Sequence, residues 1–313
     1  MIISAKAPVR VDFAGAWTDV KYFSHAFGGA TTNAAINRYV SGKTVHGAHT
    51  STDGAAISEG IAVTYETAIP AGSGLGTSSA LNVVWLALAS GKQIKSLEQR
   101  AQIAEQAYQV ETVLGILGGK QDQYAAAHGG FHLYEFHEDQ INVHPVQITP
   151  DRIAELESLF TLCYTGQARF SSTLHENVWG GFRAGKRQVV DALFALRDSA
   201  YQAKVLLEEG NWDKFGTLLN HQHQCAKNLD ASLSNDRVES ILELTKPFTI
   251  GGKCCGAGGG GCMLFLSSTP EMQQQCAAVL EKNQIQVIPF QFAMDGLSVE
   301  RIGEDSSQFL HTL

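Results

Sequence analysis

The spacing of hydrophobic and polar positions predicts strands in the first 68 residues. Residues 9–13 alternate between apolar and polar side chains, the period of two that is typical of a strand. Residues 32–48 and 61–68 carry similar runs, separated by polar turns. The chain is therefore expected to begin with a β-rich region.

The period changes to that of a helix after a glycine-rich loop. Apolar side chains recur every three or four positions over 77–90, which predicts a helix there. Ser96 followed by Gln99 is the pattern of a capping box. It predicts a second helix that continues to about Leu114, where glycines break the pattern.

In the rest of the chain, the pattern of apolar and polar positions predicts a pair of strands followed by a mainly helical half. The chain has 313 residues, about the length of two domains. We place the boundary at Pro150, between a first domain (1–150) and a second (151–313). The further expected elements are strands at 131–136, 141–146, 159–164, 262–266 and 286–290, and helices at 184–209, 212–227, 235–246 and 270–283.

Composition narrows the class of protein. Hydrophobic residues make up 44% of the chain and charged residues 17%, which excludes intrinsic disorder. The net charge is −8 without a basic stripe, so nucleic acid is not an expected partner. The longest nearly apolar run, Ala80–Ala89, is too short for a membrane span, and the start has no signal-peptide pattern. We expect a cytoplasmic protein without a membrane partner, either a monomer or a homodimer.

The six cysteines and the histidines show no metal or redox pattern. No cysteines form a CxxC pair, and the adjacent Cys254 and Cys255 are poor partners for each other or for one metal ion. We expect reduced cysteines that behave as small, semi-apolar side chains. The histidines form neither an HxxxH spacing nor a hydrolytic triad, and we expect them to be structural.

The glycine-rich loop at 70–80 reads Pro-Ala-Gly-Ser-Gly-Leu-Gly-Thr-Ser-Ser-Ala and leads directly into a predicted helix. Glycines permit close approach of the backbone to a ligand, and a helix N-terminus suits an anion. No lysine follows the last glycine, so the loop is not a Walker A motif, and its spacing is not GxGxxG. We interpret it as a phosphate-binding loop. The alternative is an ordinary helix N-terminus that serine or threonine caps.

Two carboxylates follow this loop. Glu111 lies on or beside the apolar face of the helix expected at 97–114, and an inward carboxylate is costly unless it is paired or binds a metal. Asp122 comes after a glycine break. The alternatives are a Glu111 at the rim of a rotated helix and an Asp122 that merely begins another helix. Together with the loop, the two carboxylates supply what phosphoryl transfer needs: a phosphate cradle, a metal ligand and a group that orients a hydroxyl.

A third cluster, Gly256–Gly261, precedes an apolar run and fits either a flexible loop or a phosphate contact. In order, Ala7–Gly15, Pro70–Ala80 and Lys253–Gly261 resemble the motifs of the GHMP kinase family, named for galactokinase, homoserine kinase, mevalonate kinase and phosphomevalonate kinase. The resemblance covers nearly the whole chain. It implies an α+β fold with two domains, an N-terminal mixed α/β ATP-binding domain and a C-terminal ferredoxin-like domain.

The resemblance also implies ATP and Mg²⁺ as cofactors and assigns roles to residues. Asp122 would accept the proton of the substrate hydroxyl or orient that hydroxyl. Arg10 would stabilise the transferring phosphoryl group and keep Asp122 ionised. Ser78 and Glu111 would ligate Mg²⁺, with Ser79 as the alternative to Ser78. The residues expected to bind ATP are Pro70, Gly72, Ser73, Gly74, Leu75, Gly76, Thr77, Ser78, Ser79, Gly258 and Gly259.

At the substrate end, the resemblance assigns a sugar hydrogen bond to Asp19, with Thr18, Trp17 and Gly119 beside it. A core position is the alternative for Trp17. Gly-Ala-Trp-Thr-Asp at 15–19 differs from the Gly-Glu-His-Thr-Asp of galactokinases and looks like the fucokinase and heptose-phosphate kinase branch, although alanine replaces a usual glycine. A phosphorylated sugar would need a basic anchor. The candidates are Lys21, Arg38, Lys120 and Arg169.

The resemblance thus implies an enzyme, a sugar kinase that acts on the anomeric hydroxyl of an aldose or aldose phosphate, such as fucose or D-glycero-D-manno-heptose 7-phosphate. Two alternatives stay open: a family member that phosphorylates another hexose or a small alcohol, and a catalytically silent sugar-binding sensor. A nicotinamide dehydrogenase built on the glycines is a poor alternative, because their spacing does not follow the Rossmann order.

Overall fold

The alternating residues at the start of the chain form β1 (Ile2–Ala14), which pairs antiparallel with the long strand β2 (Gly29–Thr50). The apolar side chains within 9–13 are buried in the core, as the period of two predicts. Arg10 and Asp12, on the opposite face, are buried as well. Because β1 is covered on both faces over residues 9–13, the polar side chains of this part need partners inside the protein.

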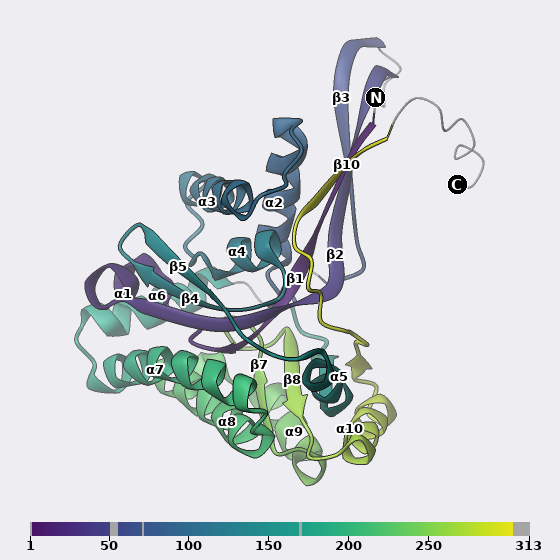
Figure 1. Cartoon of the computed structure of the whole chain (residues 1–313). Coiled ribbons are helices and arrows are strands. Elements are labelled where there is room, and N and C mark those ends of the chain that lie inside the picture. The colour runs from purple at the N-terminus through teal and green to yellow at the C-terminus, as the bar shows by residue number, and fades with distance from the viewer. Residues whose placement is uncertain (1, 51–55, 71, 169–170, 303–313) are drawn as a thin grey trace.

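The computed structural model describes residues 2–50, 56–70, 72–168 and 171–302. The first sheet has the strand order β10-β1-β2-β4-β5, and β3 also pairs with β2. Its other strands are β3 (Ala56–Thr67), β4 (Phe131–His137), β5 (Gln140–Pro145) and β10 (Ser298–Ile302). Strand β10 comes from the second half of the chain and pairs with β1 (Figure 1). The first sheet is therefore built from both ends of the described chain, and the boundary at Pro150 stays a prediction.

The second sheet has the order β7-β8-β6-β9, with all neighbours antiparallel. Its strands are β6 (Phe160–Tyr164), β7 (Gly251–Cys254), β8 (Cys262–Leu266) and β9 (Gln286–Val287). The succession of strands and helices in this half is βαββαβ, and this strand order gives the ferredoxin-like arrangement that we expected. Strand β9 is shorter than the predicted strand because pairing ends after two residues.

Helices pack against both sheets (Figure 1). Helices α2 (Thr77–Ser90) and α3 (Leu97–Val113) occupy the predicted positions, and the capping box of Ser96 and Gln99 is present. The other helices near predicted positions are α7 (Arg187–Glu209), α8 (Trp212–Leu229), α9 (Asp236–Thr245) and α10 (Pro270–Lys282). The periodicity misses α1 (Lys21–Phe27), α4 (Gln121–His128), α5 (Pro150–Leu159) and α6 (Ser171–Arg183).

An aromatic cluster joins the two halves of the molecule. The ring of Phe13, which is fully buried, lies 5.4 to 6.4 Å from the rings of Phe131, Phe160, Phe215 and Phe292, measured between centroids. Burying one such side chain contributes about 1.5–3 kcal/mol to stability. The first sheet and the second half therefore share a continuous core, and the site described next lies where they meet.

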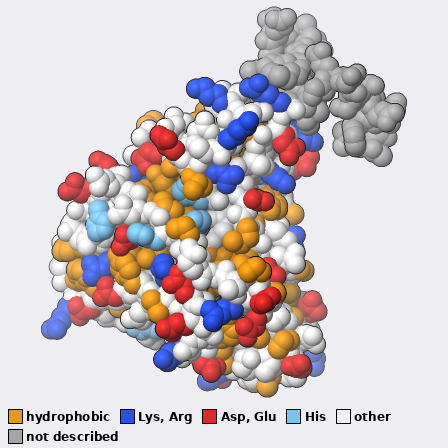
Figure 2. Space-filling model, in the orientation of Figure 1, with side chains coloured by type: hydrophobic (Ala, Val, Ile, Leu, Met, Phe, Trp, Pro, Cys, Tyr) orange, Lys and Arg blue, Asp and Glu red, His pale blue; other side chains and the backbone are white. Residues whose placement is uncertain are grey.

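The cysteines, the length of the helices and the surface charge can also be compared with the sequence-based expectations. All six cysteines are buried and none forms a disulfide, as expected. Over the described ranges, no helix combines the length and the apolar character that crossing a bilayer requires. Figure 2 shows acidic and basic side chains intermixed on the face that carries α5 and α10. The net charge of −8 is therefore not gathered into one patch on this face.

Candidate active site

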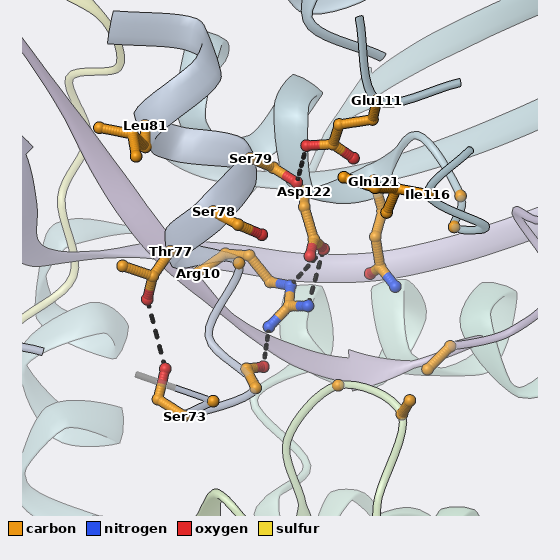
Figure 3. A pocket seen from close by; sticks show the side chains of 18 of the residues that line it. Arg10, Ser73, Thr77, Ser78, Ser79, Leu81, Glu111, Ile116, Gln121 and Asp122 are labelled. Carbon is orange, nitrogen blue, oxygen red and sulfur yellow. Dashed lines mark hydrogen bonds and ion pairs between the residues drawn. The ribbon is translucent and has the colours of Figure 1, made fainter. Parts of the chain in front are cut away.

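A cavity of about 480 Å³ opens where the first glycine loop meets the second half of the chain. Its walls come from the turn after β1, the loop before α2, the segment between α3 and α4, and the second glycine loop. Figure 3 shows that the side chains expected to act in catalysis and metal binding lie together in this cavity.

The first glycine loop ends at Gly76, the N-cap of α2. Gly72, Gly74 and Gly76 have φ values of 69°, 76° and 77°, a conformation that glycine adopts without strain. Among the described residues, no side chain caps the N-terminus of α2, although hydroxyl side chains are close. The alternative of a serine- or threonine-capped helix is therefore wrong. The amide groups of the first turn have no side-chain cap, and they suit an anion.

Arg10 and Asp122 form an ion pair at the centre of the cavity. Arg10 Nε and Nη2 lie 2.9 and 2.7 Å from Asp122 Oδ1, and Nη1 donates to the Gly74 carbonyl at 2.5 Å. Burial disfavours the guanidinium charge, but the carboxylates of Asp122 and Asp12 outweigh it, and the pKa of Arg10 is raised. A Cβ on Gly76 would lie 3.1 Å from Asp122 Cγ. The pair therefore lies against the first turn of α2.

Glu111 points inward from α3 and is only 6% exposed. Its Oε1 accepts hydrogen bonds from Ser79 Oγ at 2.9 Å and Asn82 Nδ2 at 3.0 Å, and its Oε2 accepts one from Gln123 Nε2 at 2.8 Å. Burial raises the pKa of Glu111, and these hydrogen bonds oppose the rise. The structure brings Ser79 rather than Ser78 onto Glu111. Ser78 is exposed, and its hydroxyl is turned toward the cavity (Figure 3).

These oxygen atoms fit Mg²⁺, which takes hard oxygen ligands and is usually bound by one or two carboxylates together with substrate phosphates. A cation beside Glu111 would offset the burial that disfavours its charge. The Ser79 hydroxyl donates its proton to Glu111 and keeps lone pairs for a metal. No cluster of three or more metal-ligating residues occurs among the described ones. A bound ion would therefore need phosphate oxygens to complete its ligands.

Asp19 and Gly119 lie in contact at another wall of the cavity. Gln121 N donates to Asp19 Oδ2 at 3.1 Å. A Cβ on residue 119 would lie 1.8 Å from the same oxygen, so glycine alone fits there. Burial raises the pKa of Asp19 to about 7, and the hydrogen bond from Gln121 opposes this rise. Asp19 and Gly119, two of the four predicted substrate residues, therefore line the cavity.

The other two predicted substrate residues, Trp17 and Thr18, differ in whether they line the cavity. Trp17 lines the cavity, and its ring lies 4.7 Å from that of His175. It is also only 4% exposed and belongs to a hydrophobic cluster with Trp179, so the alternative of a core position holds for it as well. Thr18 is fully buried, and its hydroxyl donates to the backbone carbonyls of Gly15 and Ala30 and accepts the N–H of Ala30. Thr18 therefore stabilises the turn and does not line the cavity, which corrects its prediction as a sugar ligand.

The second glycine loop reaches the cavity through Gly256 and Ala257 rather than through the predicted Gly258 and Gly259. Gly258 and Gly259 pack against carbonyl groups of a neighbouring turn instead. The two glycine loops are joined, because the first residue of β8 donates its N–H to the Ser73 carbonyl at 2.6 Å. The loop does contribute to the cavity, as predicted, but by residues nearer its start.

Two other predicted ATP residues, Pro70 and Leu75, do not line the cavity. Leu75 is fully buried because its side chain packs into the hydrophobic core and anchors the loop. The predicted residues that do line the cavity are Gly72, Ser73, Gly74, Gly76, Thr77, Ser78 and Ser79.

The three candidate phosphate anchors that the structure describes are not among the cavity-lining residues. Lys120 pairs with Glu105 at 3.0 Å, and Arg38 donates to a backbone carbonyl. Lys21 does not line the cavity either, and Arg169 lies outside the described residues. Of the four candidates, Arg169 alone has no described position.

His175 of α6 also lines the cavity, although none of the sequence patterns above pointed to it and the histidines were expected to be structural. Its Nδ1 accepts a hydrogen bond from Trp179 Nε1 at 3.1 Å, which assigns the ring proton of the neutral form to Nε2. The signal available was the spacing of four between a histidine and a tryptophan, which share one face of a helix.

Two family models match this chain. The GHMP kinases N terminal domain matches residues 38–130, and the GHMP kinases C terminal domain matches residues 203–285. A D-glycero-alpha-D-manno-heptose 7-phosphate kinase of Campylobacter jejuni is 32% identical over 75% of this chain and 69% of its own length. An L-fucokinase/L-fucose-1-P guanylyltransferase of Bacteroides fragilis is 29% identical over 72% of this chain, but this match spans only 24% of that longer relative.

Solved structures share the fold. The crystal structure of a D-glycero-D-manno-heptose 1-phosphate kinase from Bacteriodes thetaiotaomicron has a TM-score of 0.74 at 24% identity, covering 96% of this chain and 99% of that one. The predicted α+β fold and the similarity to the heptose-phosphate kinase and fucokinase branch are thereby confirmed. The chain belongs to the GHMP kinase family and is a phosphotransferase with an alcohol group as acceptor.

Proposed function

We propose that this kinase transfers the γ-phosphoryl group of ATP, with Mg²⁺, to the anomeric hydroxyl of an aldose or aldose phosphate. One observation carries the proposal: Asp122, held by Arg10, lies in the cavity beside the N-terminus of α2. A carboxylate that can orient a hydroxyl or accept its proton is thereby adjacent to backbone groups that suit phosphate. This arrangement supports direct in-line transfer without a phosphoenzyme.

The contacts of Asp122 suggest a role for each of its oxygens. Both contacts from Arg10 are to Oδ1, so we assign Oδ2 to the substrate hydroxyl. Oδ2 orients this hydroxyl and receives its proton as the hydroxyl oxygen attacks, while Arg10 stabilises the charge on the transferring group. Mg·ATP, when bound, would supply the γ-phosphoryl group and leave as ADP, and the Mg²⁺ would neutralise part of the phosphate charge. Glu111, with Ser79 or Ser78, would hold the ion.

The sugar end of the cavity favours a free aldose. Asp19 can accept hydrogen bonds from sugar hydroxyls, and Trp17, Val20 and Leu117 supply apolar wall beside it. Among the described lining residues, Arg10 alone is a lysine or arginine, and Asp122 already engages it. An aldose phosphate would therefore depend on a cation outside the described lining. Fucose and heptose 7-phosphate, which appear in the names of the relatives, are the first substrates to compare.

The test is ADP release with Mg·ATP over a panel of free and phosphorylated aldoses, including fucose, galactose, mannose and heptose 7-phosphate. We expect turnover with one or a few of them and a product blocked at the anomeric position. Turnover with a non-sugar alcohol alone would overturn the sugar assignment. Thermal stabilisation by a sugar without ADP release would favour a sensor.

Variants then test the residue roles. Asp122→Asn should lower kcat by about 10²–10⁴-fold, whereas Asp139→Asn, at a side chain that is 95% exposed, should leave it unchanged. Glu111→Gln should raise the Mg²⁺ concentration needed for half-maximal rate. Full kcat in the Asp122 variant would refute the proton-acceptor role, and an unaltered Mg²⁺ requirement would refute the metal assignment.

A further inference from the structure

A buried series of alternating charges joins the second glycine loop to the Arg10–Asp122 pair. Asp12, fully buried in β1, has its Oδ2 2.6 Å from Lys253 Nζ, and its Oδ1 accepts the N–H of Gly256 at 2.6 Å. Lys253 Nζ also donates to the backbone carbonyl of Asp12 at 2.7 Å. The order of the series is Lys253, Asp12, Arg10 and Asp122, with opposite charges adjacent throughout.

Arg10 lies between two carboxylates but binds only one of them closely. Its guanidinium nitrogens are 2.7 and 2.9 Å from Asp122 Oδ1, whereas Nη1 is 3.8 Å from Asp12 Oδ1. A buried carboxylate that has lost its cation costs several kcal/mol. Without Lys253, Asp12 would therefore attract Arg10, and Arg10 would leave Asp122. Lys253 prevents this competition because it already neutralises Asp12.

We propose that Lys253 and Asp12 are positioning residues for phosphoryl transfer: Lys253 neutralises Asp12 and thereby keeps Arg10 on Asp122. Asp12 also ties Gly256, a residue of the cavity wall, to the same series. The position of the second glycine loop and the orientation of the Asp122 carboxylate are thus coupled through Asp12. This inference rests on the role proposed above for Asp122.

The decisive variant is Lys253→Met, which keeps the length of the side chain and removes its charge. We expect kcat to fall by about 10- to 100-fold, because Arg10 moves toward Asp12. The KM for the sugar should change less than about twofold, because Asp19 and Gly119 are untouched. Lys204→Met, which removes the 2.6 Å ion pair to Glu208 outside the cavity, is the matched control and should leave kcat unchanged.

A second substitution should rescue the first. Asp12→Asn combined with Lys253→Met should restore kcat to within about tenfold of the wild type, because an amide does not attract Arg10 and still accepts the N–H of Gly256. A merely structural role predicts the opposite, a double variant at least as impaired as Lys253→Met. Thermal unfolding of each variant separates loss of fold from loss of rate.

Three results would overturn the inference. The first is a Lys253→Met enzyme whose kcat is within threefold of the wild-type value. The second is a double variant whose kcat is no higher than that of Lys253→Met. If Lys253→Met does not fold, the third is a double variant whose kcat is more than tenfold below the wild-type value. Failure of the proposed function has a separate signature, because the wild type itself would then release no ADP with any sugar.

Discussion

At the scale of the single residue, Gly119 determines where the Asp19 carboxylate lies. A Cβ on residue 119 would be 1.8 Å from Asp19 Oδ2, so Gly119→Ala must displace Asp19 or the start of α4. We expect kcat/KM for the sugar to fall by about 10²-fold, the order of loss that a 1 Å misplacement causes. Steady-state kinetics with varied sugar at saturating ATP measures it.

Gly118→Ala is the neighbouring control, because a Cβ there meets nothing within 4 Å. It should cost less than about threefold in kcat/KM. Equal losses in the two variants would mean that the loop as a whole, rather than the position of Asp19, is sensitive.

The titration of Asp19 predicts that sugar affinity depends on pH. Burial raises the pKa of this carboxyl to about 7, so it is largely protonated at pH 6 and largely ionised at pH 8. The ionised form accepts more hydrogen bonds from sugar hydroxyls. We expect the Kd of the sugar to fall by up to about tenfold from pH 6 to pH 8, as measured by calorimetry. Asp19→Asn should bind weakly at both pH values, and a wild-type Kd that is level across this range would contradict the prediction.

At the scale of the element, α2 is bounded by two glycines in the left-handed region, Gly76 with a φ of 77° and Gly91 with a φ of 61°. Alanine at either position should lower the free energy of unfolding by about 1–2 kcal/mol. A Cβ on Gly76 would also lie 3.1 Å from Asp122 Cγ, whereas one on Gly91 meets nothing within 4 Å. We therefore expect similar destabilisation in urea but a fall in kcat, by at least about tenfold, only for Gly76→Ala. Loss of kcat in Gly91→Ala would show that the integrity of the helix, not the contact with Asp122, matters.

The elements that sequence predicts well carry strong local signals. The capping box before α3 combines two side chains whose spacing has one common structural meaning. Helix α4, in contrast, has eight residues, nearly all buried, and so offers no polar face from which a period could be recognised. Helix α6 contains Gly180 and Gly181, which lower helix propensity and conceal its length.

At the scale of the whole molecule, the motifs predict which loops meet but not which atoms touch. The placement of Ser79 instead of Ser78 on Glu111, and of Gly256 instead of Gly258 at the cavity, depends on how each loop is registered against its neighbour. The pairing of β10 with β1 joins residues at opposite ends of the described chain. Such arrangements follow from tertiary packing, which no local period encodes.

Two buried histidines, His128 and His132, should make the free energy of unfolding of the whole molecule depend on pH. Burial lowers the pKa of His128 and His132 to about 4 from a usual value of 6.5. The unfolded chain therefore binds protons first, and these residues lower the free energy of unfolding as pH falls from about 6.5 toward 4. Asp19 and Glu111 act in the opposite direction, because their raised pKa values favour the folded state at acid pH. The free energy of unfolding of the wild type in acid therefore depends on both groups of residues, which change it in opposite directions.

Replacing both histidines by glutamine isolates their part of this balance. The glutamine side chain stays neutral at every pH, so the double variant should gain stability relative to wild type when the pH falls from 7 to 5. Each histidine should contribute about 1–2 kcal/mol to this change, which urea unfolding at the two pH values measures. His25→Gln, at a side chain that is 45% exposed, controls for the loss of a histidine outside the core. If the difference between the double variant and the wild type were the same at both pH values, the two buried histidines would have no part in acid destabilisation.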